Sequence, residues 1–339
     1  MAAEPKLTLK DFKSDQEVRW CPGCGDYAIL AAVQAFMPEL GIPRENIVFI
    51  SGIGCAARFP YYMQTYGMHS IHGRAPAIAT GLAVSRPDLS VWVVTGDGDA
   101  LSIGGNHLIH ALRRNVNLTI LLFNNRIYGL TKGQYSPTSE LGKVTKSTPF
   151  GSVDNPFNPV SLALGADATF VARTLDSDRK HLTEVLRQAS AHQGASLVEI
   201  YQNCNIFNDG AFDLLKDPNT RGDWIIGLEH GQPLRFGAGH AVVRDPATGS
   251  LRVEDGVAEG DPRVVVHDAH AEDPSYAFAL SRLSQTDSRL TPMGVFRSVE
   301  RPSYDRLVNE QADLAKLKAP GDTGALGELL RGSDPWTIA

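Results

Sequence analysis

Short runs of apolar residues alternate with stretches of helical periodicity through the first two-thirds of the chain. The runs Val91–Val94 and Leu118–Phe123 are each too short for a helix, and they predict buried strands of a parallel sheet. Further strands are predicted at Asn46–Ser51, Thr169–Arg173 and Ala195–Tyr201. The alternation of strands with helical stretches predicts an α/β fold with a parallel sheet and helices on both of its faces.

The helices expected between these strands are amphipathic or rich in small residues. They are predicted at Tyr27–Met37, Ala77–Val84, Leu108–Leu112, Ser161–Ala168 and His181–His192. Thr131–Thr148 is polar and rich in Ser, Thr and Lys, so it predicts a long loop near the site that could act as a lid.

The last third of the chain has a weaker pattern. Residues 205–240 show no clear periodicity, and residues 241–268 have the character of strands. Two helices are predicted at Asp273–Leu283 and Tyr304–Lys318, with Pro292–Phe296 as a short apolar turn between them. We therefore divide the chain into an N-terminal arm (1–19), an α/β domain (20–204) and a C-terminal extension (205–339).

Composition narrows the class of protein. The chain has 339 residues, of which 42% are hydrophobic and 21% charged, with a net charge of −6. This charge argues against a nucleic-acid partner. No apolar run approaches the roughly 20 residues that span a bilayer, and the N-terminus lacks the apolar core of a signal peptide. We expect a cytoplasmic protein that does not enter a membrane.

Polar residues follow the two central strands where each strand ends. Gly96–Asp99 follows the first strand and Asn124-Asn125 follows the second. The carboxyl ends of neighbouring parallel strands lie side by side, which is where ligands bind in open α/β sheets. Mg²⁺ prefers oxygen ligands. Asp97 offers a carboxylate oxygen, Asn125 an amide oxygen, and Ile127 a backbone carbonyl.

Two glycines complete this pattern. Gly96 and Gly98 would let the backbone approach a diphosphate closely and direct N–H groups at it. A Gly-Asp-Gly string by itself fits an ordinary turn between a strand and a helix better. Together with the two asparagines at the end of the second strand, the string favours a site for a diphosphate bridged to a metal ion over an ordinary turn.

The four cysteines of the chain suggest a metal or cluster site. Cys21 and Cys24 form a CxxC pair, and Cys55 and Cys204 each follow a predicted strand. A structural disulfide is not expected in a reducing compartment. The spacing alone leaves three interpretations open: an iron–sulfur cluster, a zinc ion, or thiols without a ligand. If the last strand is parallel to the others, Cys204 emerges at the same edge as Cys55 and Gly96.

Five motifs in order resemble the β subunit of 2-oxoacid:ferredoxin oxidoreductases. They are WCPGCGD from Trp20, SGIGC ending at Cys55, IHGRAPAIATG from Ile71, GDGD from Gly96 and IYGLTKGQ from Ile127. The match covers about the first two-thirds of the chain. The strings QNCNIFNDG from Gln202 and PMGVFRSVERPSYD from Pro292 are most similar to the 2-oxoglutarate branch of this family.

The resemblance implies a thiamine diphosphate-binding fold of the pyrophosphate-domain type. It implies thiamine diphosphate, Mg²⁺ and one [4Fe–4S] cluster as cofactors, with the cluster bound by Cys21, Cys24, Cys55 and Cys204. Asp97, Asn125 and Ile127 would hold the magnesium ion. The residues expected to contact the cofactor are Ile53, Gly54, Cys55, Ala56, His72, Gly73, Arg74, Gly96, Gly98, Asp99, Gly129 and Leu130. For His72 and Arg74, a capping and packing role is the alternative.

The implied reaction is the oxidative decarboxylation of 2-oxoglutarate to succinyl-CoA and CO₂, with electrons passing through the cluster to ferredoxin. A partner α subunit, with or without a fused γ subunit, would complete the site in a heterodimer or a dimer of heterodimers, so the chain alone should be inactive. Arg58 and Lys132 are candidates for binding the distal carboxylate of the substrate, and solvated surface charge is the alternative.

Three other functions fit the same residues. The enzyme could act on pyruvate or another 2-oxoacid. It could be a non-oxidative thiamine diphosphate lyase in which the thiols are incidental. It could also be a non-catalytic scaffold subunit that binds zinc, although the two metal-binding strand ends argue against that.

Overall fold

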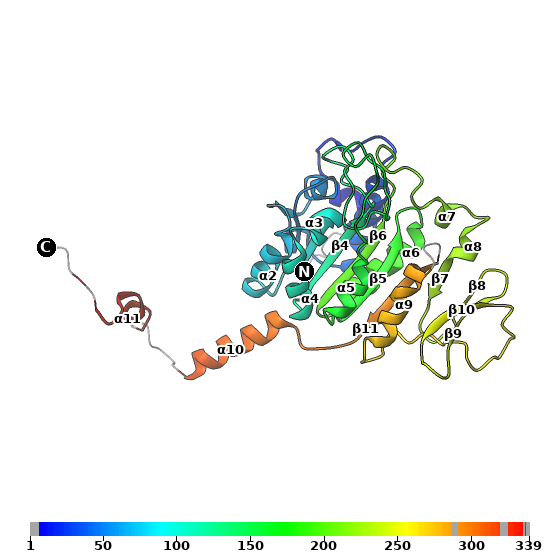
Figure 1. Cartoon of the computed structure of the whole chain (residues 1–339). Coiled ribbons are helices and arrows are strands. Elements are labelled where there is room, and N and C mark those ends of the chain that lie inside the picture. Colours follow the sequence, from blue (N-terminus) through cyan, green and yellow to red (C-terminus); the bar gives the residue numbers. More distant parts are fainter. Residues whose placement is uncertain (1–6, 287–289, 319–324, 335, 337–339) are drawn as a thin grey trace.

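An eight-stranded sheet forms the centre of the protein in the computed structural model, which describes residues 7–286, 290–318, 325–334 and 336 (Figure 1). The strand order is β2-β1-β3-β4-β6-β5-β11-β7. The strands are β1 (Ile47–Ser51), β2 (Tyr66–His69), β3 (Ser90–Gly96), β4 (Leu118–Asn124), β5 (Phe170–Leu175), β6 (Ala195–Tyr201), β7 (Ile225–Leu228) and β11 (Thr291–Ser298).

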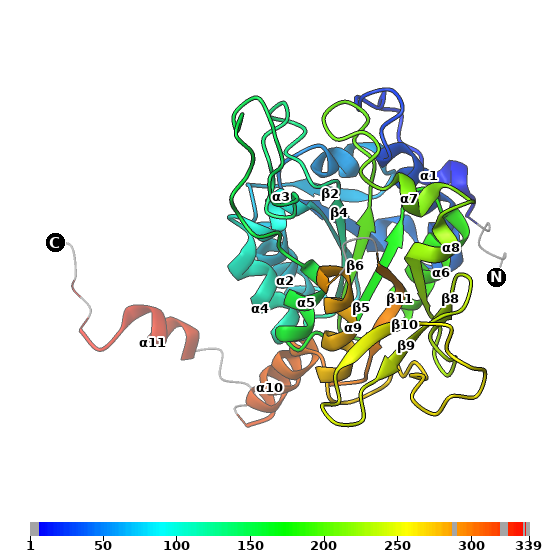
Figure 2. The same ribbon diagram turned by 45° about the vertical axis from the view of Figure 1, so that its right-hand side comes forward.

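Six neighbouring strands of this sheet, from β2 to β5, are parallel to one another. β11 pairs with β5 in antiparallel fashion, and β7 is parallel to β11. A smaller sheet of three strands lies beside the β7 edge (Figure 2). Its strands are β8 (Arg235–Phe236), β9 (His240–Arg244) and β10 (Leu251–Asp255).

Helices cover both faces of the large sheet, as predicted. Alternate residues of a strand point to opposite faces, so Val91 and Val93 belong to one apolar core while Trp92 and Val94 belong to the other. The first core is covered by α2 (Ala75–Ser85), α4 (Gly105–Arg113), α5 (Pro159–Gly165) and α9 (Ser275–Thr286). The second is covered by α1 (Asp26–Phe36), α6 (Arg179–Ala191) and the 3₁₀ helix Ala56–Tyr62.

The last third of the chain joins the central sheet through β7 and β11. Residues 205–240 contain α7 (Asp213–Lys216), α8 (Arg221–Trp224), β7 and β8, none of which the sequence predicted. The prediction of a turn at Pro292–Phe296 is wrong, because these residues lie within β11. A proline inside an apolar run argues against a strand. Here Pro292 lies near the start of β11, and its carbonyl accepts a hydrogen bond of 3.3 Å from Nη1 of Arg173.

Two further features concern the ends of the chain. The short helix predicted near Leu9–Phe12 is present as a 3₁₀ helix, whereas residues 1–6 of the predicted arm lie outside the described residues. Near the other end, the start of α10 (Tyr304–Lys318) packs against α2 and its later part projects away from the sheet (Figures 1 and 2), and α11 (Ala325–Arg331) follows it. No helix in the described ranges is long and apolar enough to cross a membrane.

Candidate cofactor and metal-binding site

The carboxyl ends of β1, β3, β4 and β6 surround a small cavity of about 80 Å³. It brings together all three expected magnesium ligands and ten of the twelve residues expected at the cofactor. The lining includes Ile53, Gly54, Cys55, Ala56, His72, Gly96, Asp97, Gly98, Asp99, Asn125, Ile127, Gly129 and Leu130. The other two expected residues, Gly73 and Arg74, lie just outside this lining.

Asp99 links two of the loops around this cavity to the end of β3. Its Oδ1 accepts hydrogen bonds from the backbone N–H groups of Ile53 (3.0 Å) and Gly73 (2.8 Å) and lies 2.5 Å from Nδ1 of His72. Its Oδ2 accepts a bond from the Thr95 hydroxyl at 2.7 Å. Because its oxygens are engaged in this way, Asp99 positions the loops in this structure. Asp99 also lines the cavity, and its direct contact with the cofactor stays a prediction.

Helix α3 (Asp97–Leu101) begins inside the Gly-Asp-Gly string, so Asp97 and Gly98 belong to a helix and not to a turn between strand and helix. Asp97 is the first residue of this helix, where the positive end of the helix dipole stabilises a carboxylate. The space beside the string is close-packed, because a Cβ on Gly98 would overlap the ring of Tyr128. The Tyr128 hydroxyl in turn donates to the Gly98 carbonyl at 3.2 Å.

Asp97 and Asn125 face the cavity from neighbouring strands. Burial raises the pKa of Asp97 to about 6, against the hydrogen bonds that lower it. A nearby cation would restore the ionised form, because an opposite charge favours it. The oxygen-rich donor set of Asp97, Asn125 and Ile127 fits a magnesium ion. In this structure Oδ1 of Asn125 accepts a bond of 3.2 Å from the Ile127 N–H.

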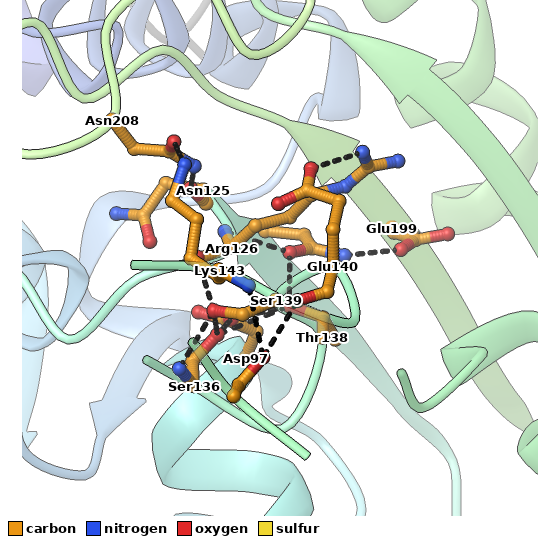
Figure 3. A network of polar contacts seen from close by, with 12 residues as sticks. Asp97, Asn125, Arg126, Ser136, Thr138, Ser139, Glu140, Lys143, Glu199 and Asn208 are labelled. Carbon is orange, nitrogen blue, oxygen red and sulfur yellow. Dashed lines mark hydrogen bonds and ion pairs between the residues drawn. The ribbon is translucent and has the colours of Figure 1, made fainter. Parts of the chain in front are cut away.

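The polar segment after β4 folds back over these residues (Figure 3). Arg126 pairs with Glu140 at 2.8 Å, and Lys143 donates a hydrogen bond to Oδ1 of Asn208. Asn208 also donates to the Asn125 carbonyl at 2.8 Å. The predicted loop is therefore tied by side chains to the strand end that carries Asn125. Its action as a lid stays a prediction.

Cys55 and Cys204 lie close to each other beside the same cavity, with Cys24 and Cys21 near them. The Sγ atoms of Cys55 and Cys204 lie 3.5 and 3.7 Å from the point where a Cβ on Gly129 would be. Cys24 interacts electrostatically with Cys55 and Cys204, and Cys55 with Cys21. Chain segments far apart in sequence thus converge on one place.

Burial raises the pKa of Cys55 to about 12 and also raises the pKa of Cys24, with the carboxylate of Asp26 acting in the same direction. Both side chains are therefore protonated thiols at neutral pH unless a bound cation stabilises the thiolate form. Such a soft, four-sulfur set fits an iron–sulfur cluster or zinc. As they stand, no group of three or more His, Cys, Asp or Glu side chains within the described ranges is arranged to hold a metal ion.

A larger cavity of about 650 Å³ adjoins the first and shares Ile53, Gly54 and Leu130 with it. Arg58 lines this cavity, and its Nε donates to the Tyr62 hydroxyl at 3.2 Å. Lys132 is exposed and is not among the residues that line either cavity. The small cavity is below the roughly 300–1,000 Å³ of pockets that enclose a whole ligand. Together, the two cavities offer an open site at the rim of the sheet.

Sequence reasoning missed several residues of this site. Asp26 and Gln202 line the small cavity, and Nε2 of Gln202 donates to the sulfur of Cys24 at 3.2 Å. Ser136 and Thr138 bond directly to Asp97. The Ser-Pro-Thr-Ser string at 136–139 was a signal for polar contacts, but its target could not be deduced because the path of the loop depends on the fold.

Comparisons with known proteins agree with this geometry. The family "Thiamine pyrophosphate enzyme, C-terminal TPP binding domain" matches residues 52–200, the segment that carries most of the lining of the small cavity. The 2-oxoglutarate oxidoreductase subunit KorB of Mycobacterium tuberculosis is 64% identical over 97% of this chain and 88% of its own length. The chain belongs to the β subunits of 2-oxoacid:ferredoxin oxidoreductases.

Other members of this family extend the likeness. The 2-oxoglutarate synthase subunit KorB of Archaeoglobus fulgidus is 42% identical over 64% of this chain and 82% of its own length. The solved structure of a 2-oxoglutarate:ferredoxin oxidoreductase from Magnetococcus marinus, with 2-oxoglutarate, coenzyme A and succinyl-CoA bound, matches with a TM-score of 0.75. It is 34% identical and covers 98% of both chains. As a β subunit, this chain is one part of an enzyme complex with an α partner.

Proposed function

We propose that this chain is the β subunit of a 2-oxoglutarate:ferredoxin oxidoreductase that binds thiamine diphosphate, Mg²⁺ and one [4Fe–4S] cluster. The observation that carries the proposal is the meeting of two sites at Gly129. This residue lines the small cavity with Asp97 and Asn125, and a Cβ on it would lie within 4 Å of the sulfurs of both Cys55 and Cys204. A decarboxylating centre and an electron acceptor would then be neighbours.

The overall reaction balances without any further reactant. 2-Oxoglutarate and coenzyme A give succinyl-CoA, CO₂, one proton and two electrons, and two oxidised ferredoxins take up one electron each. Thiamine diphosphate, when bound, supplies the carbanion chemistry that breaks the bond to the carboxylate. The chain supplies Asp97, Asn125 and Ile127 as magnesium ligands, and Cys21, Cys24, Cys55 and Cys204 as cluster ligands.

The chain's other residues would bind and orient the cofactor and the substrate. Asp99 fixes the loops that carry Ile53 and His72, so that both face the cofactor. Arg58 lines the larger cavity, and its guanidinium would bind the distal carboxylate of the substrate. Lys132, on the exposed turn after Gly129, is the second candidate for this role. We expect the α subunit, with or without a fused γ subunit, to close the open side of the site in a heterodimer or a dimer of heterodimers.

The deciding experiment is anaerobic co-production with the α subunit, followed by iron and acid-labile sulfide analysis and by ferredoxin reduction with different 2-oxoacids. Four irons per β chain and reduction that depends on 2-oxoglutarate and coenzyme A are expected. Faster reduction with pyruvate would identify a different substrate. Decarboxylation without iron would identify a lyase, and bound zinc without thiamine diphosphate would identify a scaffold subunit.

The role of Arg58 has its own test in the assembled complex. Arg58→Ala should raise KM for 2-oxoglutarate at least tenfold, because the distal carboxylate loses its cation. Arg86→Ala is the matched control, since Arg86 is an exposed arginine paired with Asp88. An unchanged KM and kcat in Arg58→Ala would remove Arg58 from this role and leave Lys132→Ala as the next variant to measure.

A further inference from the structure

Two hydroxyl groups from the segment after β4 hold one oxygen of Asp97. Ser136 Oγ lies 2.5 Å and Thr138 Oγ1 lies 2.6 Å from Oδ2 of Asp97. Among the described residues no side chain bonds to Oδ1. We propose that Ser136 and Thr138 are positioning residues that hold Asp97 with Oδ1 free to bind the magnesium ion. This inference rests on the proposed function, and it assigns roles to residues outside the metal-binding motif.

The single proton of the Thr138 hydroxyl has two acceptors within reach. Besides Asp97, it lies 2.9 Å from Oδ1 of Asn124. The amide of Asn124 is fixed in orientation because its Nδ2 donates to the buried Glu199 carboxylate at 2.7 Å. Its Oδ1 already accepts from the Arg126 N–H at 3.2 Å. Thr138 is therefore free to donate to Asp97, and a bond to an ionised acceptor is the shorter and stronger choice.

Ser139 connects the same segment to the other metal-binding strand end. Its hydroxyl accepts from the Ser136 N–H at 2.8 Å and donates to the Arg126 carbonyl at 2.6 Å. Arg126 directly follows Asn125, so the segment Ser136–Ser139 spans both strand ends that supply metal ligands (Figure 3). We call Ser136–Ser139 the hydroxyl clasp.

Burial makes the hydroxyl clasp hard to replace by water. Asp97, Ser136, Thr138 and Ser139 are each no more than 4% exposed. If Ser136 or Thr138 lost its hydroxyl, Oδ2 of Asp97 would lose a fixed donor, and the carboxylate would be free to rotate. Mutation of a residue that hydrogen-bonds to a metal ligand typically lowers the metal affinity by about 10–100-fold.

The test uses the assembled α–β complex with Mn²⁺ as the metal probe and thiamine diphosphate present. Free Mn²⁺ is followed by electron paramagnetic resonance during titration. Ser136→Ala and Thr138→Val should each weaken Mn²⁺ binding about tenfold, while the iron content stays as in the wild type. Thr138→Ser keeps the hydroxyl and should restore most of the affinity. Ser147→Ala, an exposed serine of the same segment, is the control and should bind Mn²⁺ like the wild type.

Unchanged Mn²⁺ affinity in Ser136→Ala and Thr138→Val would overturn the role of the hydroxyl clasp. A wild-type complex that binds no Mn²⁺ with thiamine diphosphate would instead overturn the proposed function itself. Should Thr138→Val lower the melting temperature of the metal-free complex, the decision rests on Ser136→Ala and Thr138→Ser. Equal affinity in Ser136→Ala, or no recovery in Thr138→Ser, then counts against the proposal.

Discussion

The Nε atom of Arg173 lies 2.6 Å from Oε2 of Glu199, and the two side chains are 1% and 0% exposed. They stand opposite each other on the paired strands β5 and β6. The guanidinium also lies over the rings of Tyr201 and Phe296, and the other carboxylate oxygen accepts from Asn124. This ion pair therefore anchors the polar network that leads to Asp97.

The first prediction follows from this ion pair. Glu199→Gln should lower the free energy of unfolding by about 3–5 kcal/mol, because it leaves the Arg173 charge buried without a counter-ion. Glu39→Gln is the matched control. It removes an exposed pair with Arg187, which is worth about 0–1 kcal/mol. Urea denaturation measures both, and equal midpoints for the two variants would contradict the prediction.

Gly129 provides a test of the cluster that does not depend on activity. An added Cβ would make ordinary contacts with the sulfurs of Cys55 and Cys204, so Gly129→Ala should fold. The methyl group would occupy space that a cluster needs, and iron content should fall at least several-fold. Gly81→Ala, in a helix with open space around it, should load iron normally. Full iron loading in Gly129→Ala would place the cluster elsewhere.

The raised pKa of Cys55 predicts its reactivity in cluster-free protein. With a pKa of about 12, about one thiol in 10⁴ is ionised at pH 8, and the thiolate is the reactive form. Iodoacetamide should therefore modify Cys55 far more slowly than the exposed Cys21, and its rate should rise with pH up to about 12. Mass spectrometry of timed samples measures both rates. Equal rates at pH 8 would show that its surroundings do not raise the pKa of the half-buried Cys55.

His192 predicts a pH dependence of stability. Burial lowers its pKa to about 4 from an ordinary value of 6.5, and Nε2 lies 2.7 Å from the Thr169 hydroxyl. Between these two values the unfolded chain binds the proton and the folded chain does not. Stability is therefore complete above pH 6.5 and falls as the pH drops towards 4, by on the order of 2 kcal/mol.

The measurement is the melting temperature from pH 7.5 to pH 4.5. His192→Gln should show a shallower decline than the wild type, because glutamine does not titrate. His110→Gln, at an exposed position of α4, is the control. Parallel curves for the wild type and His192→Gln would contradict the prediction.

Much of the central sheet could be predicted because its signals are local. Val91–Val94 and Leu118–Phe123 are apolar runs of strand length, and β3 and β4 contain them. Once both runs are parallel strands, Asp97 and Asn125 must emerge at one edge, and the small cavity confirms that they meet there. The family resemblance carried the assignment of the four cysteines, which spacing alone had left open.

The features that were missed depend on contacts between distant parts of the chain. The strand at Thr291–Ser298 pairs with Arg173 and its neighbours, more than 100 residues earlier, and no local pattern shows that partner. Ser136 and Thr138 lie in a polar segment without periodicity, so nothing in the sequence directs their hydroxyls to Asp97. Asp97 itself was expected in a turn, because two glycines usually end regular structure.

The position of β11 between β5 and β7 has a consequence for biosynthesis. The ribosome completes β6 at Tyr201, but the strand that covers the free edge of β5 ends only at Ser298. At synthesis rates of about 5–20 residues per second, this edge stays without its neighbour for roughly 5–20 s. A nascent chain therefore passes through a stage in which its largest sheet is open to pairing with other polypeptides, and protection by a chaperone would matter most in that interval.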